Sequence, residues 1–171
     1  DFLKAYNIAK EVHKNQFRDE GTPYITHIDG ILKILKNELQ ENSFDTYTIV
    51  ALHDVLEDSD KYTKEDLAEI FDPYLADFVD VLTKKEGMSI EEYLKQILNY
   101  KYNNIVIEIK LADRLHNVRS LKKIIKTKLE KVKKYIKETE DYYLPIALDN
   151  HKELYHLIKS ELDTLKELIK Q

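Results

Sequence analysis

The densest group of residues that can do chemistry is the segment His53-Asp54-Val55-Leu56-Glu57-Asp58. If the segment is helical, its four polar side chains fall within an arc of about 140°, because each residue turns about 100°. Three carboxylates and an imidazole crowded on one face repel one another, and a bound cation relieves that repulsion. The segment therefore indicates a metal site. Imidazole and carboxylate ligands suit Mn, Fe, Zn or Mg.

Two adjacent ligands bind a metal weakly, so further ligands must come from elsewhere in the chain. His27 opens the preceding predicted helix, and Asp113 lies in the segment Leu111-Ala112-Asp113-Arg114-Leu115-His116-Asn117. Asp113 shares one helical face with Asn117 and Ser120. A His-Asp pair also arises by chance, and two acidic residues often form no more than a helix end. The spacing alone leaves both interpretations open.

The elements that must position these residues are predicted to be helices. Apolar residues recur at helical spacing in most of the chain. Residues 105–111 alternate like a strand, but the stretch continues without a breaker and no partner strand is evident, so we predict a helix there. Starts are expected at an Asp45 N-cap and at capping boxes opened by Thr63 and Ser89. The predicted helical segments are 2–17, 28–39, 45–58, those after 63 and 89, a short one at 78–82, one from 105 through Leu115 and beyond, 121–136 and 154–169.

Composition agrees with an all-α bundle of about eight helices in a single domain, residues 1–171. The chain has only 3 Gly and 3 Pro, which leaves little room for the turns of a β-sandwich or barrel. It has no cysteine, so disulfides and thiolate metal sites are excluded. No apolar run approaches the roughly 20 residues of a membrane span, and no signal peptide is evident, so a cytoplasmic location without membrane contact is expected. The net charge of -5 argues against a nucleic-acid partner.

Three blocks of the sequence, in the right order, resemble the hydrolase domain of the RelA/SpoT family of alarmone enzymes, particularly the stand-alone small alarmone hydrolases. The resemblance runs from the first helix to about Ala147. The first block carries Ala9 to His13, Gln16, Arg18, Gly21, Pro23, Tyr24 and His27; the second is Ala51–Asp58; the third is Lys110–Leu121. A weaker fourth block is Glu138-Thr139 with Tyr143, Pro145 and Ala147.

The resemblance implies an HD-type helical domain that binds Mn(II) and removes pyrophosphate from the 3′ position of ppGpp or pppGpp, leaving GDP or GTP. By that resemblance the metal ligands are His27, His53, Asp54 and Asp113. Glu57 and Asp58 are the implied catalytic carboxylates, and either one could be the base.

The implied partner is a small-molecule nucleotide, which Arg18, Asn117 and Ser120 would face. One departure concerns this substrate: Asp19 and Glu20 follow Arg18, where the family often has Lys and a small polar residue. Their charge would repel a ligand rich in phosphate.

Several roles and alternatives stay open at this stage. Arg114 could offset charge on the phosphoryl group or form an ion pair with a neighbouring helix. His13 is expected to be a hydrogen-bonded core residue, and His116 could buttress a ligand. The rival functions are an HD phosphohydrolase for another nucleotide, such as the 2′-phosphate of NADPH, and a non-catalytic nucleotide-sensing domain. The sequence does not indicate an oligomeric state.

Overall fold

A computed structural model describes all residues from 1 to 171, and every regular element in it is a helix. The predicted all-α class is therefore confirmed. The α-helices are α1 (Phe2–Val12), α2 (Ile25–Lys33), α3 (Phe44–Leu52), α4 (Val55–Asp58), α5 (Lys64–Ile70), α6 (Pro73–Leu82), α7 (Ile90–Leu98), α8 (Asn103–Ser120), α9 (Leu129–Glu138), α10 (Leu144–Asn150) and α11 (Lys152–Ile169). Short π-helical stretches, Ile34–Glu38 and Thr139–Tyr143, extend α2 and α9, and a 3₁₀ turn, Leu121–Lys123, follows α8.

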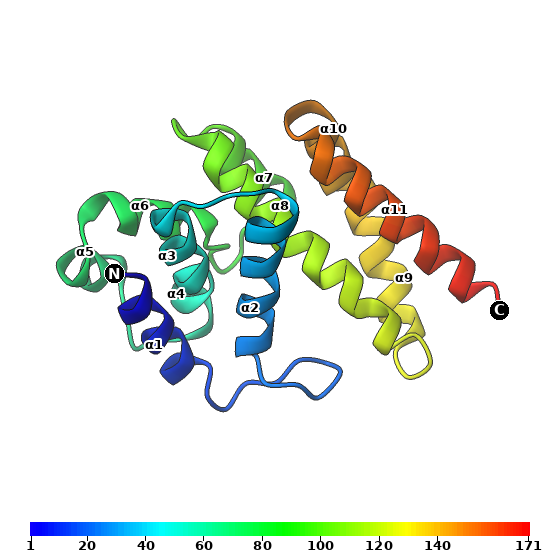
Figure 1. The fold of residues 1–171 in the computed structure, drawn as a ribbon, viewed down its shortest axis with the longest axis horizontal. Helices are drawn as coiled ribbons and strands as arrows, with labels where there is room; N and C mark the ends of the chain where they lie inside the picture. The colour runs from blue at the N-terminus through cyan, green and yellow to red at the C-terminus, as the bar shows by residue number, and fades with distance from the viewer.

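The long helix α8 joins the two parts of the bundle. It contacts α2, α3, α6 and α7 of the N-terminal part, and it packs along α11 of the C-terminal part (Figure 1). Because partners cover it on several sides, its residues Val106, Ile107, Ile109 and Leu111 are all buried. A helix that is buried nearly all round loses the usual one-sided apolar stripe. This explains why the alternating pattern at 105–111 accompanies a helix, as predicted.

The two predicted capping boxes are confirmed. The Thr63 backbone N–H donates to Asp66 Oδ2 at 2.7 Å, and Thr63 Oγ1 accepts from the Asp66 N–H at 3.1 Å. Ser89 and Glu92 make the same reciprocal pair at 2.8 and 3.1 Å. These contacts satisfy backbone donors that a helix start leaves free, so they fix where α5 and α7 begin.

The predicted single helix over 45–58 is wrong, and the break falls within the chemical segment. In the structure, α3 begins at Phe44 and ends at Leu52. Its N-cap is Ser43 rather than the predicted Asp45. His53 Nδ1 hydrogen-bonds the Val50 carbonyl oxygen at 2.7 Å, so a side chain takes up an acceptor at the helix end. The chain turns at Asp54 (φ −105°, ψ 1°) and restarts as α4.

Two other predicted boundaries also differ from the structure. The first helix ends at Val12 instead of residue 17, and Phe17 pairs with Pro23 in a loop. The predicted helix over 121–136 begins only at Leu129, because Leu121 and Ile124 are buried through a 3₁₀ turn instead of a continuous helix. No Gly or Pro marks that interruption. None of the helices is long and apolar enough to cross a membrane.

Candidate metal centre and adjoining pocket

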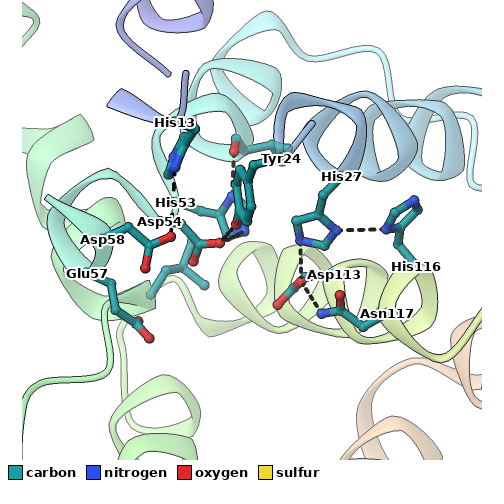
Figure 2. Close-up of polar contacts among 12 residues, drawn as sticks. His13, Tyr24, His27, His53, Asp54, Glu57, Asp58, Asp113, His116 and Asn117 are labelled. Atoms are coloured by element: carbon teal, nitrogen blue, oxygen red, sulfur yellow. Dashed lines mark hydrogen bonds and ion pairs between the residues drawn. The ribbon is translucent and has the colours of Figure 1, made fainter. Parts of the chain in front are cut away.

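Three of the four predicted metal ligands converge in the interior of the bundle. One ligand atom each from His27, His53 and Asp113 lies within 4.8 Å of the other two, and all three residues are buried. They come from α2, the end of α3 and α8, which are distant in sequence (Figure 2). The fourth, Asp54, follows the helix break and places Oδ2 3.1 Å from His53 Nε2. The structure thus brings all four predicted side chains together.

The donor set fits a divalent cation. His53 Nε2 is buried and has no hydrogen-bond partner in the protein, while Nδ1 is used by the Val50 carbonyl. With its proton on Nδ1, the ring presents a bare lone pair on Nε2 to the carboxylates. His27 Nε2 lies 2.9 Å from Asp113 Oδ1. Two ligands that bond one ion at about 2.1 Å and at right angles lie about 3 Å apart, so these spacings suit a shared cation.

Burial and nearby negative charge make the charged form of Asp54 unfavourable in this cluster. Burial raises the pKa of Asp54 well above its usual range, and the negative charge of Asp113 adds to the effect. Burial lowers the pKa of His27 to about 3 and also lowers that of His53, so both imidazoles stay neutral and cannot balance the acids. A divalent cation at this place would favour both carboxylates in their charged form.

Lys110 partly supplies the missing positive charge. Its Nζ donates to Asp113 Oδ2 at 2.8 Å, one helical turn away on α8. Although burial alone would raise it, the pKa of Asp113 is held well below its usual range by the charge of Lys110 and by a hydrogen bond with His27. No role was predicted for Lys110 from the sequence. Its spacing three residues before Asp113 was the signal available.

Polar contacts hold the two carboxylates of the cluster in place. The Tyr24 hydroxyl donates to Asp54 Oδ2, and the Tyr24 ring lies on His13 with centroids 4.2 Å apart. Asn117 Nδ2 donates to Asp113 Oδ1 at 2.9 Å. His13 is buried, as predicted from the sequence, whereas the contact of Tyr24 with Asp54 was not predicted.

The two predicted catalytic carboxylates stand at the edge of the cluster, on α4. Asp58 Oδ2 accepts from Gln16 Nε2 at 3.0 Å and lies 3.8 Å from His13 Nδ1. Glu57 Oε2 accepts from the backbone N–H of Lys84 at 2.9 Å. Figure 2 shows Asp58 beside Asp54, with Glu57 on the outer side. The two acids are therefore anchored to different parts of the chain.

A pocket of about 340 Å³ adjoins the cluster, and all three residues predicted to face the nucleotide line it. Arg18 Nη2 donates to Asn117 Oδ1 at 2.6 Å, and Arg18 Nε is buried without a partner. Ser120 donates to the His116 carbonyl oxygen at 3.0 Å. Tyr24 and Asn117 belong both to this pocket wall and to the contacts around the ligands. They connect the pocket to the metal centre.

The acidic residues after Arg18 are balanced by lysines. Asp19 pairs with Lys128 at 2.8 Å and with Lys131 at 2.5 Å. These hydrogen bonds lower the pKa of Asp19. Glu20 lies 4.0 Å from Lys123. The negative charge of these two acids, which was expected to repel phosphate, is therefore offset by lysines that follow α8 in the chain.

The structure decides between the two interpretations of Arg114 in favour of the ion pair. Its guanidinium lies between the rings of Tyr135 and Tyr143, 3.7 and 4.0 Å from their centroids. Nε donates to Thr139 Oγ1 at 2.9 Å, and Nη2 pairs with Glu138 at 2.9 Å. Arg114 therefore joins α8 to α9 and the π-helical stretch after it.

Comparison with known proteins places this arrangement in a family. Residues 5–150 match the HD domain. The chain is 35% identical over 168 residues to a guanosine-3′,5′-bis(diphosphate) 3′-pyrophosphohydrolase of Haemophilus influenzae, covering 92% of this chain and 23% of that protein. It is 39% identical over 171 residues to the protein of that name from Aquifex aeolicus, covering 95% and 23%. The chain thus spans about a quarter of the length of these curated relatives.

A solved structure agrees with these matches. The structure, described as a metazoan ortholog of SpoT that hydrolyzes ppGpp, superposes with a TM-score of 0.81 at 25% identity. The match covers 95% of this chain and 94% of the other. The resemblance to the RelA/SpoT family that the sequence blocks indicated is confirmed. Because the HD domain matches most of the chain, residues 5–150, the chain belongs to the HD domain family.

Proposed function

We propose that this chain is a metal-dependent hydrolase of ppGpp and pppGpp, which releases the 3′-pyrophosphate and leaves GDP or GTP. The observation that carries the proposal is the buried convergence of His27, His53 and Asp113, with Asp54 beside them, next to a pocket lined by Arg18. The names of the similar proteins supply the substrate. In this proposal residues 1–171 act as one HD domain in the cytoplasm.

The cation would be held by His27, His53, Asp54 and Asp113. When bound, a divalent metal polarises a phosphoryl oxygen and lowers the pKa of a bound water. Neutral imidazole and carboxylate donors suit Mn(II), although Fe, Zn and Mg take the same donors. Mn(II) is our choice because of the resemblance to the alarmone hydrolases.

The remaining chemistry falls to the acids on α4. Attack of water on the phosphorus next to the ribose requires a group that takes the water proton, and the departing ribose oxygen requires a proton in return. Asp58 has one oxygen anchored by Gln16, and its other oxygen is free to accept a proton. Glu57 is anchored in the same one-sided way by the Lys84 N–H. Carboxylates fixed near the reacting water act as general bases and acids.

The pocket would hold the nucleotide so that only its 3′ group reaches the metal centre. Its volume lies at the lower end of the range, about 300–1,000 Å³, that is usual for small-molecule sites. Arg18 offers a charged donor with an unused Nε–H, and Tyr24 and Tyr135 add aromatic surface. Position decides which phosphate reacts, because metal activation alone does not distinguish phosphoryl oxygens.

Product identification tests the proposed substrate. The purified protein and Mn(II) are incubated with ppGpp, GTP or NADPH, each in a separate reaction. The products are then separated by ion-exchange chromatography. GDP and pyrophosphate from ppGpp, with GTP intact, are expected. Untouched ppGpp together with orthophosphate release from NADPH would replace this proposal with a nucleotide 2′-phosphatase. Binding of ppGpp without turnover of any nucleotide would indicate a sensing domain.

A further inference from the structure

We infer that His116 is a positioning residue for the metal centre: it accepts a hydrogen bond from His27 Nδ1, and Gly30 leaves the space that this contact needs. The inference rests on the proposed metal site and goes beyond its four ligands. His116 lies one turn after Asp113 on α8, facing the His27 ring of α2 (Figure 2). The two Nδ1 atoms are 2.7 Å apart.

The chemistry of the imidazole ring sets the direction of this hydrogen bond when a metal is bound. His27 faces Asp113 with Nε2, so Nε2 is the atom that a cation would use. A neutral imidazole carries a single N–H, so a ring that coordinates through Nε2 carries its proton on Nδ1. That proton needs an acceptor in the protein interior, and the neighbouring atom is His116 Nδ1. His116 then carries its own proton on Nε2.

Such a contact does two things for a metal-binding histidine. It selects the protonation form in which the coordinating nitrogen has a free lone pair, and it fixes the rotation of the ring. His27 is buried, so water cannot take over the role of acceptor. Loss of the acceptor would leave either a buried N–H without a partner or a ring in the wrong protonation form. Both outcomes weaken metal binding.

Gly30 supplies independent support, because its missing side chain is what admits the His116 ring. A Cβ added to Gly30 would lie 2.1 Å from Cδ2 and from Nε2 of His116. The residue is inside α2, where Gly is less favourable than Ala, so helix formation gives no reason for it. Gly30 lies three residues after His27. Its missing Cβ instead lets α8 bring His116 against α2.

The acceptor is tested with a matched pair of variants, His116→Asn and His116→Leu, of similar size. The Asn side-chain oxygen can take the place of Nδ1 as an acceptor, and Leu cannot. Mn(II) affinity of the metal-free protein is measured by isothermal titration calorimetry, with circular dichroism as the check on folding. His116→Asn should stay within about threefold of wild type, and His116→Leu should lose about 10- to 100-fold in affinity. The exposed His156→Leu serves as the control and should bind as wild type does.

Gly30→Ala tests the clearance, and the double variant Gly30→Ala/His116→Ala, compared with His116→Ala, tests its cause. Gly30→Ala should lose Mn(II) affinity although Ala favours the helix. Without the ring, no side-chain atom of residue 116 reaches the added methyl group, so Gly30→Ala should cause no further loss of Mn(II) affinity in the His116→Ala background.

Any one of five results would overturn the inference. The acceptor role is contradicted if His116→Leu binds as wild type does, or if His116→Asn loses as much as His116→Leu. The clearance role is contradicted if Gly30→Ala binds as wild type does, or if Gly30→Ala lowers the affinity as much in the His116→Ala background as it does in wild type. Wild-type protein that binds no Mn(II) would overturn the proposed metal site itself, and this inference with it.

Discussion

One ring nitrogen of His53 makes a hydrogen bond to the backbone, and the other makes none within the protein. Nδ1 ends α3 by bonding the Val50 carbonyl, while buried Nε2 makes no hydrogen bond within the protein and lies 3.1 Å from Asp54 Oδ2. Asp54 faces the same space and is held by Tyr24. Asp58 and Glu57 lie farther along and are anchored elsewhere. Neighbouring residues in one short segment are therefore suited to two roles, metal ligation and proton transfer.

Substitutions at Asp54 and Glu57 should separate these roles. Asp54→Ala removes a proposed ligand and should abolish both metal binding and turnover. Glu57→Gln keeps the shape and should retain the metal while turnover falls by about 10²- to 10⁴-fold, the usual contribution of a general acid or base. Metal content by elemental analysis and turnover are measured on the same preparations. Equal metal loss in both variants would contradict the assignment.

Lys110 should matter most when the metal is absent. Its ammonium is the cation that contacts Asp113, so Lys110→Met leaves a buried carboxylate that has lost its charge partner. Removing one partner of a buried pair costs about 3 kcal/mol of unfolding free energy. Mn(II) should offset much of that loss, so the metal should raise the melting temperature of Lys110→Met more than that of wild type.

The control for this comparison is Lys137→Met, which removes an exposed pair with Asp141 and should change little. An equal effect of Mn(II) on Lys110→Met and wild type would show that Lys110 and the metal do not share Asp113.

At the scale of the helices, the two starts marked by capping boxes were predicted correctly, whereas the interruptions were not. Thr63 and Ser89 announce their helices because a capping box is a local signal, readable within four residues. The break at His53–Asp54 was missed because the His53 side chain replaces a backbone donor there, and nothing in the spacing reveals that. The four ligand residues were expected together from the resemblance, whereas Lys110 and Tyr24 required the packing of α8 and α2 to be known.

Arg114 is predicted to hold helices together and to take no part in the reaction. Its guanidinium is buried between Tyr135 and Tyr143 and pairs with a partly exposed Glu138. Arg114→Met should lower the free energy of unfolding by about 2–3 kcal/mol, a value reduced for the solvent at Glu138. Chemical denaturation measures the loss. A folded variant whose turnover falls a hundredfold without loss of stability would return Arg114 to the active site.

The whole molecule is two groups of helices joined along α8, and the proposed cation lies where α2, α3 and α8 meet (Figure 1). A ligand that binds only the folded state stabilises it by mass action, about 2.7 kcal/mol at a hundred times its Kd. Mn(II) should therefore raise the melting temperature, and a chelator should reverse the increase. In His53→Ala the metal should have almost no effect. A similar increase in that variant would place the bound ion elsewhere on the chain.

Metal-dependent hydrolysis of ppGpp is tested most directly by titrating chelator-treated protein with Mn(II). At each addition, the rate of pyrophosphate release from ppGpp is measured. The proposed site, His27, His53 and Asp113 with Asp54 beside His53, predicts one ion per chain. The rate should be near zero without metal, rise in proportion to added Mn(II) and level off at one equivalent. Full activity in the metal-free protein, or no activity at any Mn(II) concentration, would contradict the claim that this chain is a metal-dependent ppGpp hydrolase.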